Sequence, residues 1–440
     1  MDLILAFSLF ISSVILTLYY SLPMSLAMSA GFVLFMFTGL HRGFTLRSLL
    51  AMSWKGAKSS LIVVRVLLTI GIMTGLWRSA GTFAVLVAWG MKAVTPSMFV
   101  LAAFVLSCMM SYALGTSFGT AGTLGVALMT LARSGGADPV ITAGAIMSGI
   151  HFGDRGSPSS SCLHLVSALT GTEIYPNVRA FMKSAVIPLI ISLAFYLVMS
   201  LRNSIGSLNP DTITELSRAF VLSPLAVIPA VLMIALPLLH VNIFIAFMSS
   251  IIAAFVLSIT LQSLDMAGAL EVAVFGLHSD GGIKAVFNGG GLVSMLQMCL
   301  VLVISGTFSG IFDGTGMLSG MQGKISHIMQ RWGAYPVILA VSTLMDAVFC
   351  NQTAGVIMSV ELFRKPCDDS GMSRESLALD LANSGVITAP LVPCCIACSV
   401  PLSMLGEGLS ALPYACYLYL IPCAALVKSF AAKKNRASHS

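Results

Sequence analysis

Two acidic residues lie in apolar stretches, where a charge is costly and usually serves a function. The first is Asp154, in the segment Gly153–Pro158, which a run of serines follows. Carboxylate and hydroxyl oxygens are the groups that a hard cation such as Na⁺ needs to replace its hydration water. An ion pair between Asp154 and Arg155 at the membrane surface is the alternative. The ligands expected from this part of the chain are Asp154, Ser157, Ser160 and Ser161.

The second acid is Asp346, which falls late in the apolar stretch Tyr335–Phe349. In the membrane core it could bind a cation or exchange a proton, and a structural hydrogen bond to a neighbouring helix is the alternative. Amide and hydroxyl side chains follow it closely and would supply further oxygen ligands. These are Asn351, Gln352 and Thr353.

Hydroxyl groups also gather in the glycine-rich segment Gly115–Gly125. Glycine can open a membrane helix so that hydroxyls and freed carbonyls coordinate an ion, although the same small residues can simply allow close helix packing. The hydroxyls expected at the site from this segment are Thr116, Ser117 and Thr120. Asn383 and Thr388, from an interrupted apolar region near the C-terminus, complete the expected set.

The cysteines and histidines suggest other chemistry only as alternatives, one of which is a proton-carrier role for His151 or His164 near neutral pH. No CxxC pairs with a second CxxC, so we expect no metal site, with a soft-metal site at Cys394–Cys398 as the alternative. A hydrolase that uses Ser160 with His164 is conceivable, but serine and histidine in membrane segments are usually structural. We therefore expect no enzyme, no catalytic residue and no cofactor beyond transported Na⁺ or H⁺.

The composition indicates which solvent the chain occupies. Hydrophobic residues make up 57% of it and charged residues only 9%, with a mean hydropathy of +0.95. A soluble domain carries about 25% charged residues, so this chain cannot cover itself with a water-exposed surface. The net charge of +6 comes from basic residues at loops and the C-terminus, which indicates membrane topology rather than a nucleic-acid partner.

Apolar runs predict an all-α polytopic membrane protein, since a span needs about 20 apolar residues. Ten spans are expected: Leu3–Tyr20, Leu22–Leu40, Ser60–Trp77, Ser97–Leu114, Met182–Leu201, Phe220–Leu239, Val241–Leu261, Leu292–Phe312, Tyr335–Phe349 and Leu412–Val427. Between them lie apolar regions that are short or interrupted by Gly, Pro, Ser and Thr, which predict broken or re-entrant helical hairpins. These are Gly115–Leu131, Val140–Ile150, Ser159–Leu169, Ala354–Leu362 and Ser376–Leu405.

A repeated pattern indicates that the chain is two related halves. Glycines at 71, 75 and 81 recur at 306, 310 and 316, an offset of 235 residues. Thr120–Gly122 then matches Thr353–Gly355, and Gly153–Pro158 matches Gly385–Pro390, at nearly the same offset. Matches in the same order predict a duplication, with residues 1–205 as the first repeat, 206–219 as a linker and 220–440 as the second repeat.

Loop charges predict that the two repeats are inverted. The basic loop His41–Lys58 is expected in the cytoplasm, whereas its counterpart Ser263–Gly291 is acidic and expected outside. The same rule places the basic C-terminus in the cytoplasm of a multi-pass plasma-membrane protein.

The segments Leu114–Leu128 and Ala143–Pro158 resemble those of the NhaC family of Na⁺/H⁺ antiporters, as do Asn351–Gly355 and Ser384–Pro393. The resemblance covers most of Ser60 to Val427. It implies membership of the wider ion-transporter group, with inverted repeats, helical hairpins and often a dimeric scaffold beside a moving transport domain. The implied function is Na⁺/H⁺ antiport by alternating access across a lipid bilayer, with a homodimer as the implied assembly.

This chain departs from the family pattern at several acidic positions. Ser161, Asn351 and the pair Ala382-Asn383 stand where the family usually has an acid. Fewer acids suit an anionic or zwitterionic substrate, as in relatives that look like exchangers of organic acids or amino acids. The alternative function is therefore a Na⁺- or H⁺-coupled transporter or exchanger of carboxylates or amino acids.

Overall fold

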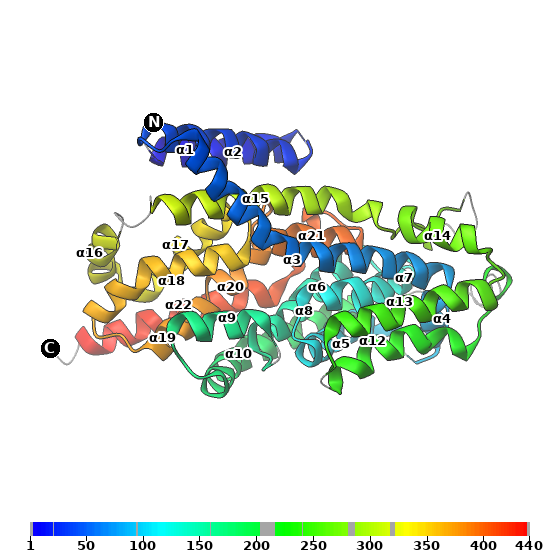
Figure 1. Ribbon diagram of the computed structural model, residues 1–440. Coiled ribbons are helices and arrows are strands. Elements are labelled where there is room, and N and C mark those ends of the chain that lie inside the picture. Colours follow the sequence, from blue (N-terminus) through cyan, green and yellow to red (C-terminus); the bar gives the residue numbers. More distant parts are fainter. Residues whose placement is uncertain are drawn as a thin grey trace.

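The computed structural model describes residues 3–20, 22–93, 96–158, 160–202, 216–239, 241–279, 287–316 and 322–437. Across these residues the chain is helical, apart from one isolated antiparallel bridge between Leu277 and Gly289. Figure 1 shows an elongated molecule in which most helices run along the long axis. Helices α16, α19 and the C-terminus lie at one end, and α4 and α14 lie at the other.

One group of helices packs around the long helices α3 and α15. It comprises α1 (Leu3–Tyr19), α2 (Met24–His41), α3 (Leu46–Ser79), α4 (Thr82–Ala93), α12 (Ile228–Leu238), α13 (Ile243–Thr260), α14 (Met266–Phe275) and α15 (Leu296–Thr315). Figure 1 shows α1 and α2 as a pair on one side of the molecule, beyond α15.

Glycines let α3 approach α15 at one place and the segment before α15 at another. A Cβ atom on Gly56 would lie 2.1 Å from the carbonyl oxygen of Gly306 and 2.6 Å from the nitrogen of Gly310. A Cβ atom on Gly71 or Gly75 would likewise lie within 3 Å of the backbone of Gly291. These glycines are required because any side chain there would overlap backbone atoms, which cannot move aside.

The second group of helices contains every interruption. It comprises α5 (Phe99–Leu114), α6 (Ser117–Thr120), η2 (Ala121–Gly125), α7 (Val126–Gly135), α8 (Pro139–Gly156), α9 (Ser161–Thr170), α10 (Ile174–Arg202), α17 (Ala334–Phe349), α18 (Gln352–Asp369), α19 (Arg374–Ala382), α20 (Gly385–Thr388), η7 (Ala389–Leu391), α21 (Ile396–Leu405) and α22 (Cys416–Ala437). Helix α16 (Gln322–Trp332) packs against α17 and α18.

Two of the interruptions are turns with the same backbone geometry. After α5, Gly115 has φ 68° and Thr116 has φ −146° and ψ 129° before α6 begins. After α17, Cys350 has φ 49° and Asn351 has φ −148° and ψ 115° before α18 begins. Helices α17 and α18 form a hairpin, and α7 runs back toward the end of the molecule that holds α4.

The other two interruptions divide longer helical paths. Helices α8 and α9 are separated by residues 157–160, and α19 to η7 is separated from α21 by residues 392–395 with a bend of 49°. Asp138 caps the start of α8 by accepting from the backbone N–H groups of Val140 and Ile141. The prediction that Val140–Ile150 is interrupted is wrong, because α8 runs unbroken to Gly156 and the break follows it.

The prediction of a helical membrane protein is confirmed by helix content and apolar helices. Two described helices are long and apolar enough to cross a membrane alone, Ile174–Arg202 and Val293–Thr315. The bent pair Arg374–Leu391 and Ile396–Leu405 adds a third if it counts as one span. Nine shorter apolar helices also occur in the described ranges, so the number of spans stays a prediction.

Two expected loops contain helix instead. The basic stretch predicted as the loop His41–Lys58 is helical from Leu46, where α3 begins after the Thr45 cap. The counterpart predicted as the loop Ser263–Gly291 contains α14. Most of the predicted linker 206–219 lies outside the described residues.

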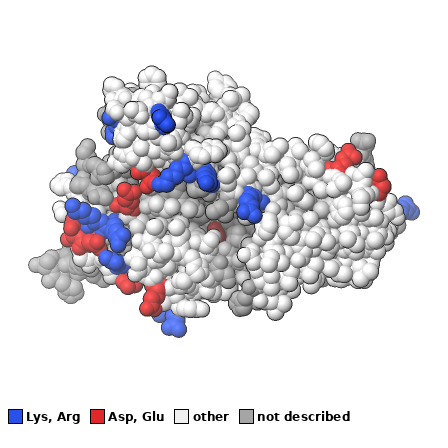
Figure 2. All heavy atoms as spheres, viewed as in Figure 1, with Lys and Arg blue, Asp and Glu red and all other residues white. Residues whose placement is uncertain are grey.

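Charged side chains are unevenly distributed over the surface. Figure 2 shows them gathered mainly toward the end that holds α16, α18 and α19, with a smaller group at the opposite end. Basic side chains also lie near the middle of this face, and a broad uncharged surface separates them from the opposite end. A broad uncharged surface is expected where a protein contacts lipid.

Candidate functional site

The interruptions of the second group are connected to one another. The hydroxyl of Ser117, just after the first turn, donates to Asp154 at the end of α8. The backbone N–H of Ile396, at the start of α21, donates to the carbonyl of Cys350 at the second turn. Non-helical backbone occurs within the membrane only where protein groups or water in a cavity form hydrogen bonds with its N–H and C=O groups.

Three of the predicted site residues are the N-caps of helices that begin after the interruptions. Thr116 caps α6 by accepting from the N–H of Gly119, and Ser160 caps α9 by accepting from Cys162 and Leu163. Asn351 caps α18 by accepting from the N–H groups of Thr353 and Ala354. Their side-chain oxygens thus satisfy helix N-termini that would otherwise lack partners.

Asp154 is buried in the last turn of α8. Its Oδ2 accepts a hydrogen bond of 3.1 Å from the Ser117 hydroxyl, and the backbone N–H of Ser117 also faces this carboxylate. The Ser160 hydroxyl donates to the backbone carbonyl of Asp154, so the break after α8 is fixed by the same serine that caps α9. The alternative of a surface ion pair with Arg155 is wrong, because both side chains are buried and no such pair forms.

Asp346 is completely buried on α17, and neither of its carboxylate oxygens has a hydrogen-bond partner in the described part of the chain. It lies against two glycines of neighbouring elements. A Cβ atom on Gly355 of α18 would be 2.1 Å from Oδ1, and one on Gly385 of α20 would be 3.4 Å from Oδ2. A buried carboxylate without donors is costly unless a cation or a proton neutralises it. The alternative of a structural hydrogen bond finds no support.

The two acids belong to one neighbourhood. The thiol of Cys162, in the first turn of α9, lies within electrostatic range of both Asp154 and Asp346. Helix α9 also packs against α18 and α19, which come from the second half of the sequence. Residues about 190 positions apart are thus brought to one region of the interior.

Arg155 is a buried charge that sequence reasoning did not place at the site. Its Nε donates to the carbonyl of Ala382, Nη1 donates to that of Phe181, and Nη2 donates to Ser184 and to the side-chain oxygen of Asn383. The buried Tyr417 hydroxyl lies within electrostatic range of Arg155 but forms no hydrogen bond among the described residues. Asn383 therefore serves to hold Arg155 in place.

The remaining predicted site residues have other partners or are exposed. Ser157 donates to the carbonyl of Tyr112 and Thr120 to that of Thr116, while Gln352 donates to the carbonyl of Val386. The hydroxyls of Thr388 and Thr343 are hydrogen-bonded at 2.9 Å. Ser161 and Thr353 are exposed.

Gly355 and Gly385 form the wall around Asp346, and sequence reasoning noted both only as members of the repeat. The contact of Asp346 with Gly385 has a counterpart in the first half, where Ser111 accepts from the N–H of Gly153 and donates to the carbonyl of Gly149. At the repeat offset of 235 residues, Asp346 of the second half corresponds to Ser111 of the first half.

Several buried cysteines lie beside this region. The thiols of Cys350 and Cys394 both donate to the carbonyl of Ala347, at 3.2 and 3.3 Å. Within the described ranges, no group of three or more His, Cys, Asp or Glu side chains is arranged to hold a metal ion. The soft-metal alternative at Cys394–Cys398 therefore has no support.

A cavity of about 500 Å³ opens beside the outer half of α18. Its lining includes Ile357, which follows Gly355 by two residues, and the charged side chains Glu361, Arg364 and Asp368. Acidic and basic side chains occur together along this part of α18. The cavity is an open hollow along the charged end of α18, and Ile357 is its lining residue nearest in sequence to Gly355.

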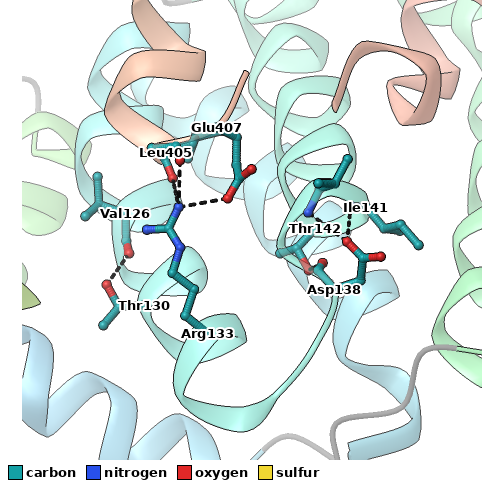
Figure 3. A network of polar contacts seen from close by, with 10 residues as sticks. Val126, Thr130, Arg133, Asp138, Ile141, Thr142, Leu405 and Glu407 are labelled. Atoms are coloured by element: carbon teal, nitrogen blue, oxygen red, sulfur yellow. Dashed lines mark hydrogen bonds and ion pairs between the residues drawn. The ribbon is translucent and has the colours of Figure 1, made fainter. Parts of the chain in front are cut away.

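A second polar network fixes the opposite end of α21. Figure 3 shows Arg133, at the end of α7, donating to the carbonyl of Leu405 and to Glu407. The Arg133 guanidinium also donates to the carbonyl of Gly406, whose φ of 68° ends α21. Because Arg133 satisfies carbonyls that the helix leaves unpaired, it anchors α21 to α7.

A helical membrane protein with broken helices and an unpaired buried carboxylate has the features of a secondary transporter. The sequence pattern of the Na⁺/H⁺ antiporter family matches residues 3–163 and 149–430. The chain therefore belongs to the Na⁺/H⁺ antiporter family, and the predicted resemblance is confirmed.

Relatives with different printed substrates are similar to the chain over most of its length. The malate-2H⁺/Na⁺-lactate antiporter of Bacillus subtilis is 25% identical over 406 residues, covering 89% of this chain and 86% of that protein. The arginine/ornithine antiporter ArcD of Halobacterium salinarum is 27% identical, covering 83% and 78%. The Na⁺/H⁺ antiporter NhaC of Alkalihalophilus pseudofirmus is 24% identical, covering 83% and 81%.

Proposed function

We propose that this chain exchanges Na⁺ for H⁺ by alternating access, with Asp346 as the carboxylate that binds them in turn. The observation that carries the proposal is the complete burial of Asp346 with no hydrogen-bond partner for either oxygen among the described residues. A proton or a Na⁺ ion neutralises the same carboxylate, so the two compete, and competition for one group is the basis of obligatory exchange.

Asp154 is the second acid of the proposed site. It differs from Asp346 because Ser117 donates to it and thereby stabilises its ionised form. Ser117 lies just beyond the first turn, so a shift of that turn would change the hydrogen bond to Asp154. Asn351 at the second turn makes no hydrogen bond to Asp346, and its proposed contribution is to fix the start of α18.

The proposed architecture is two inverted repeats, residues 1–205 and 220–440, within a fold of about ten spans plus the interrupted elements. Two features support it. Gly56 meets Gly306 and Gly310, while Gly291 meets Gly71 and Gly75, which are the same contacts with each residue moved by 235 positions. Reciprocal contacts of this kind are what a two-fold relation produces. The matching turn geometries at Gly115–Thr116 and Cys350–Asn351 agree with the same offset.

We further propose a plasma-membrane location with the charged α18 end in the cytoplasm. The C-terminal helix α22 lies at that end, as do the basic residues Arg364, Lys365 and Arg374. The cavity beside α18 would then admit cytoplasmic water and ions toward Asp346. A homodimer is the assembly that the family resemblance implies.

Exchange of carboxylates or amino acids is the second candidate function. Helices α9 and α18 begin at the interruptions, so their N-termini present partial positive charge to the site. Such N-termini suit a carboxylate group. The names of the Bacillus subtilis and Halobacterium salinarum relatives agree with substrates of this class.

The test is a transport assay with the purified protein in proteoliposomes that contain a pH-sensitive dye. A pulse of external Na⁺ is expected to drive H⁺ out of or into the lumen, according to the gradients, with no organic substrate present. If Na⁺ alone drives no pH change at any pH, while malate, lactate, arginine or ornithine does, the second candidate replaces the first.

A further inference from the structure

The buried charges of the interior do not balance. Among the described residues, the buried acidic or basic side chains are His151, counted here as neutral, and Asp154, Arg155 and Asp346. The partly buried Arg78 lies apart from them at the end of α3, where it donates to the carbonyls of Phe287 and Asn288. With both carboxylates ionised, the guanidinium of Arg155 leaves one net negative charge. A buried charge is costly inside a protein and more costly inside a bilayer. The helices that carry these residues should therefore change between inward-facing and outward-facing states most readily when this single charge is neutralised.

Arg155 is built to remain in place as a cation. Its donors go to carbonyl, hydroxyl and amide oxygens of α10 and of the C-terminal end of α19, none of which carries a charge. A guanidinium does not lose its proton under physiological conditions. With its donors occupied, Arg155 is not available to bind a substrate, and its charge is a fixed part of the interior.

The groups around Arg155 do not alter this count. The titratable side chains that face it are Tyr417 of α22 and Tyr335 of α17, which are neutral hydroxyls. Asp380 of α19 is only partly buried and lies within electrostatic range of the exposed Lys428 of α22, so these two charges offset one another.

The two buried acids are not equivalent. Asp154 accepts a hydrogen bond from the hydroxyl of Ser117, which favours its ionised form relative to that of Asp346, whose two oxygens both lack donors. The charges of Asp154 and Arg155 thus cancel and stay constant during exchange, although the two side chains contact different helices. Asp346 is the group that must gain a cation.

We infer that the chain binds one monovalent cation at a time, at Asp346, and exchanges one Na⁺ for one H⁺ without net movement of charge, because Arg155 compensates Asp154. This inference rests on the proposed function and specifies its stoichiometry. The Na⁺-bound and the protonated carriers both have a neutral interior. The exchange therefore transfers one Na⁺ in one direction and one H⁺ in the other.

The experiment determines the gradients at which exchange reverses. Proteoliposomes with the wild-type protein receive a tenfold Na⁺ gradient, and the pH difference that stops net H⁺ flux is measured. A membrane potential is then imposed with a tenfold K⁺ gradient and valinomycin. One-for-one exchange predicts a reversal point near one pH unit that the potential leaves unchanged. Exchange of two H⁺ per Na⁺ would move the reversal point by about half a unit, because one charge would cross the field.

Charge variants test the role of Arg155. The Arg155→Gln variant keeps a polar side chain but leaves two unbalanced carboxylates, so its exchange rate is expected to respond to the imposed potential. Arg155→Lys loses the planar fork but keeps the charge, and its rate is expected to stay insensitive to the potential even if the protein is less stable. The double variant Asp154→Asn with Arg155→Gln removes both fixed charges and is expected to be insensitive again.

The outcomes separate this inference from the function on which it rests. A wild-type reversal point that moves with the potential overturns one-for-one exchange while leaving Na⁺/H⁺ antiport intact. An Arg155→Gln variant that exchanges ions without any response to the potential overturns the role of Arg155. If the variants fail to fold, the wild-type reversal point alone decides. A wild-type protein with no Na⁺-driven H⁺ flux at any pH refutes the proposed function, and the inference with it.

Discussion

The Gly355→Ala variant tests whether Asp346 needs the space beside it. The new Cβ atom would lie 2.1 Å from Oδ1 and 3.1 Å from the carboxylate carbon of Asp346. To reach ordinary van der Waals contact, the carboxylate must move by about 1 Å, and a displacement of this size at a reacting group can cost about a hundredfold in rate. We therefore expect kcat/KM for Na⁺ to fall about a hundredfold, or about 2.7 kcal/mol.

Folding should survive this change. Alanine in place of glycine favours a helix by about 1 kcal/mol, which offsets part of the 1–3 kcal/mol that overpacking costs. The assay is the Na⁺ dependence of H⁺ flux in proteoliposomes, together with the melting temperature of the purified protein.

Two alanine variants provide matched controls for the Gly355 substitution. Gly385→Ala places a Cβ atom 3.4 Å from the other Asp346 oxygen and 3.0 Å from the Cβ atom of Ser342, so a shift of a few tenths of an ångström is enough. Its kcat/KM should stay within a few-fold of wild type. Gly408→Ala meets nothing within 4 Å and should behave as wild type. Equal effects at Gly355 and Gly385, or unchanged Na⁺ dependence in Gly355→Ala, would refute the reasoning.

Three further predictions concern the supports of the site. Ser117→Ala removes a hydrogen bond to the charged Asp154, worth about 1.5–3 kcal/mol, and should change the KM for Na⁺ or the pH profile of exchange with little loss of folded protein; an unchanged profile would argue against a role for Asp154. Arg133→Met removes the anchor of α21 and should lower the melting temperature, whereas Glu407→Gln removes only an ion pair with a partly exposed arginine, worth at most about 1 kcal/mol, and should be nearly neutral. Equal losses in these two variants would contradict the importance of the carbonyl contacts. Gly56→Ala forces apart the α3–α15 crossing and should reduce folded yield severely, and a normal yield in detergent would contradict the close contact.

The helices and the position of Asp346 could be predicted from local patterns. Apolar runs mark most of the helices, and Asp346 is an acid in an apolar stretch. The breaks were harder to place, because their glycines and hydroxyls are also typical of close packing. The prediction of an interruption within Val140–Ile150 was wrong because small residues there serve helix contacts: a Cβ atom on Gly149 would lie 2.5 Å from the Cβ of Ser107 on α5.

Arg155 could not be placed from the sequence. Adjacent residues on a helix point about 100° apart, so Asp154 and Arg155 cannot face the same neighbour. Asp154 meets Ser117 of the first half, while Arg155 reaches Asn383 of the second half. Only the tertiary structure brings Asn383 to that side of α8, and no local pattern encodes it.

The most direct test of the central claim compares two acids in the same transport assay. Asp346→Asn keeps the shape of the side chain but removes the exchangeable charge, whereas Asp380→Asn does so at a partly exposed position on α19. Asp346→Asn should fold because it removes an unpaired buried charge, and Asp380→Asn should fold because its side chain is partly exposed. Na⁺-driven H⁺ flux should be lost in Asp346→Asn and stay within a few-fold of wild type in Asp380→Asn. Wild-type flux in a folded Asp346→Asn protein would contradict the assignment of Asp346 as the ion-binding carboxylate.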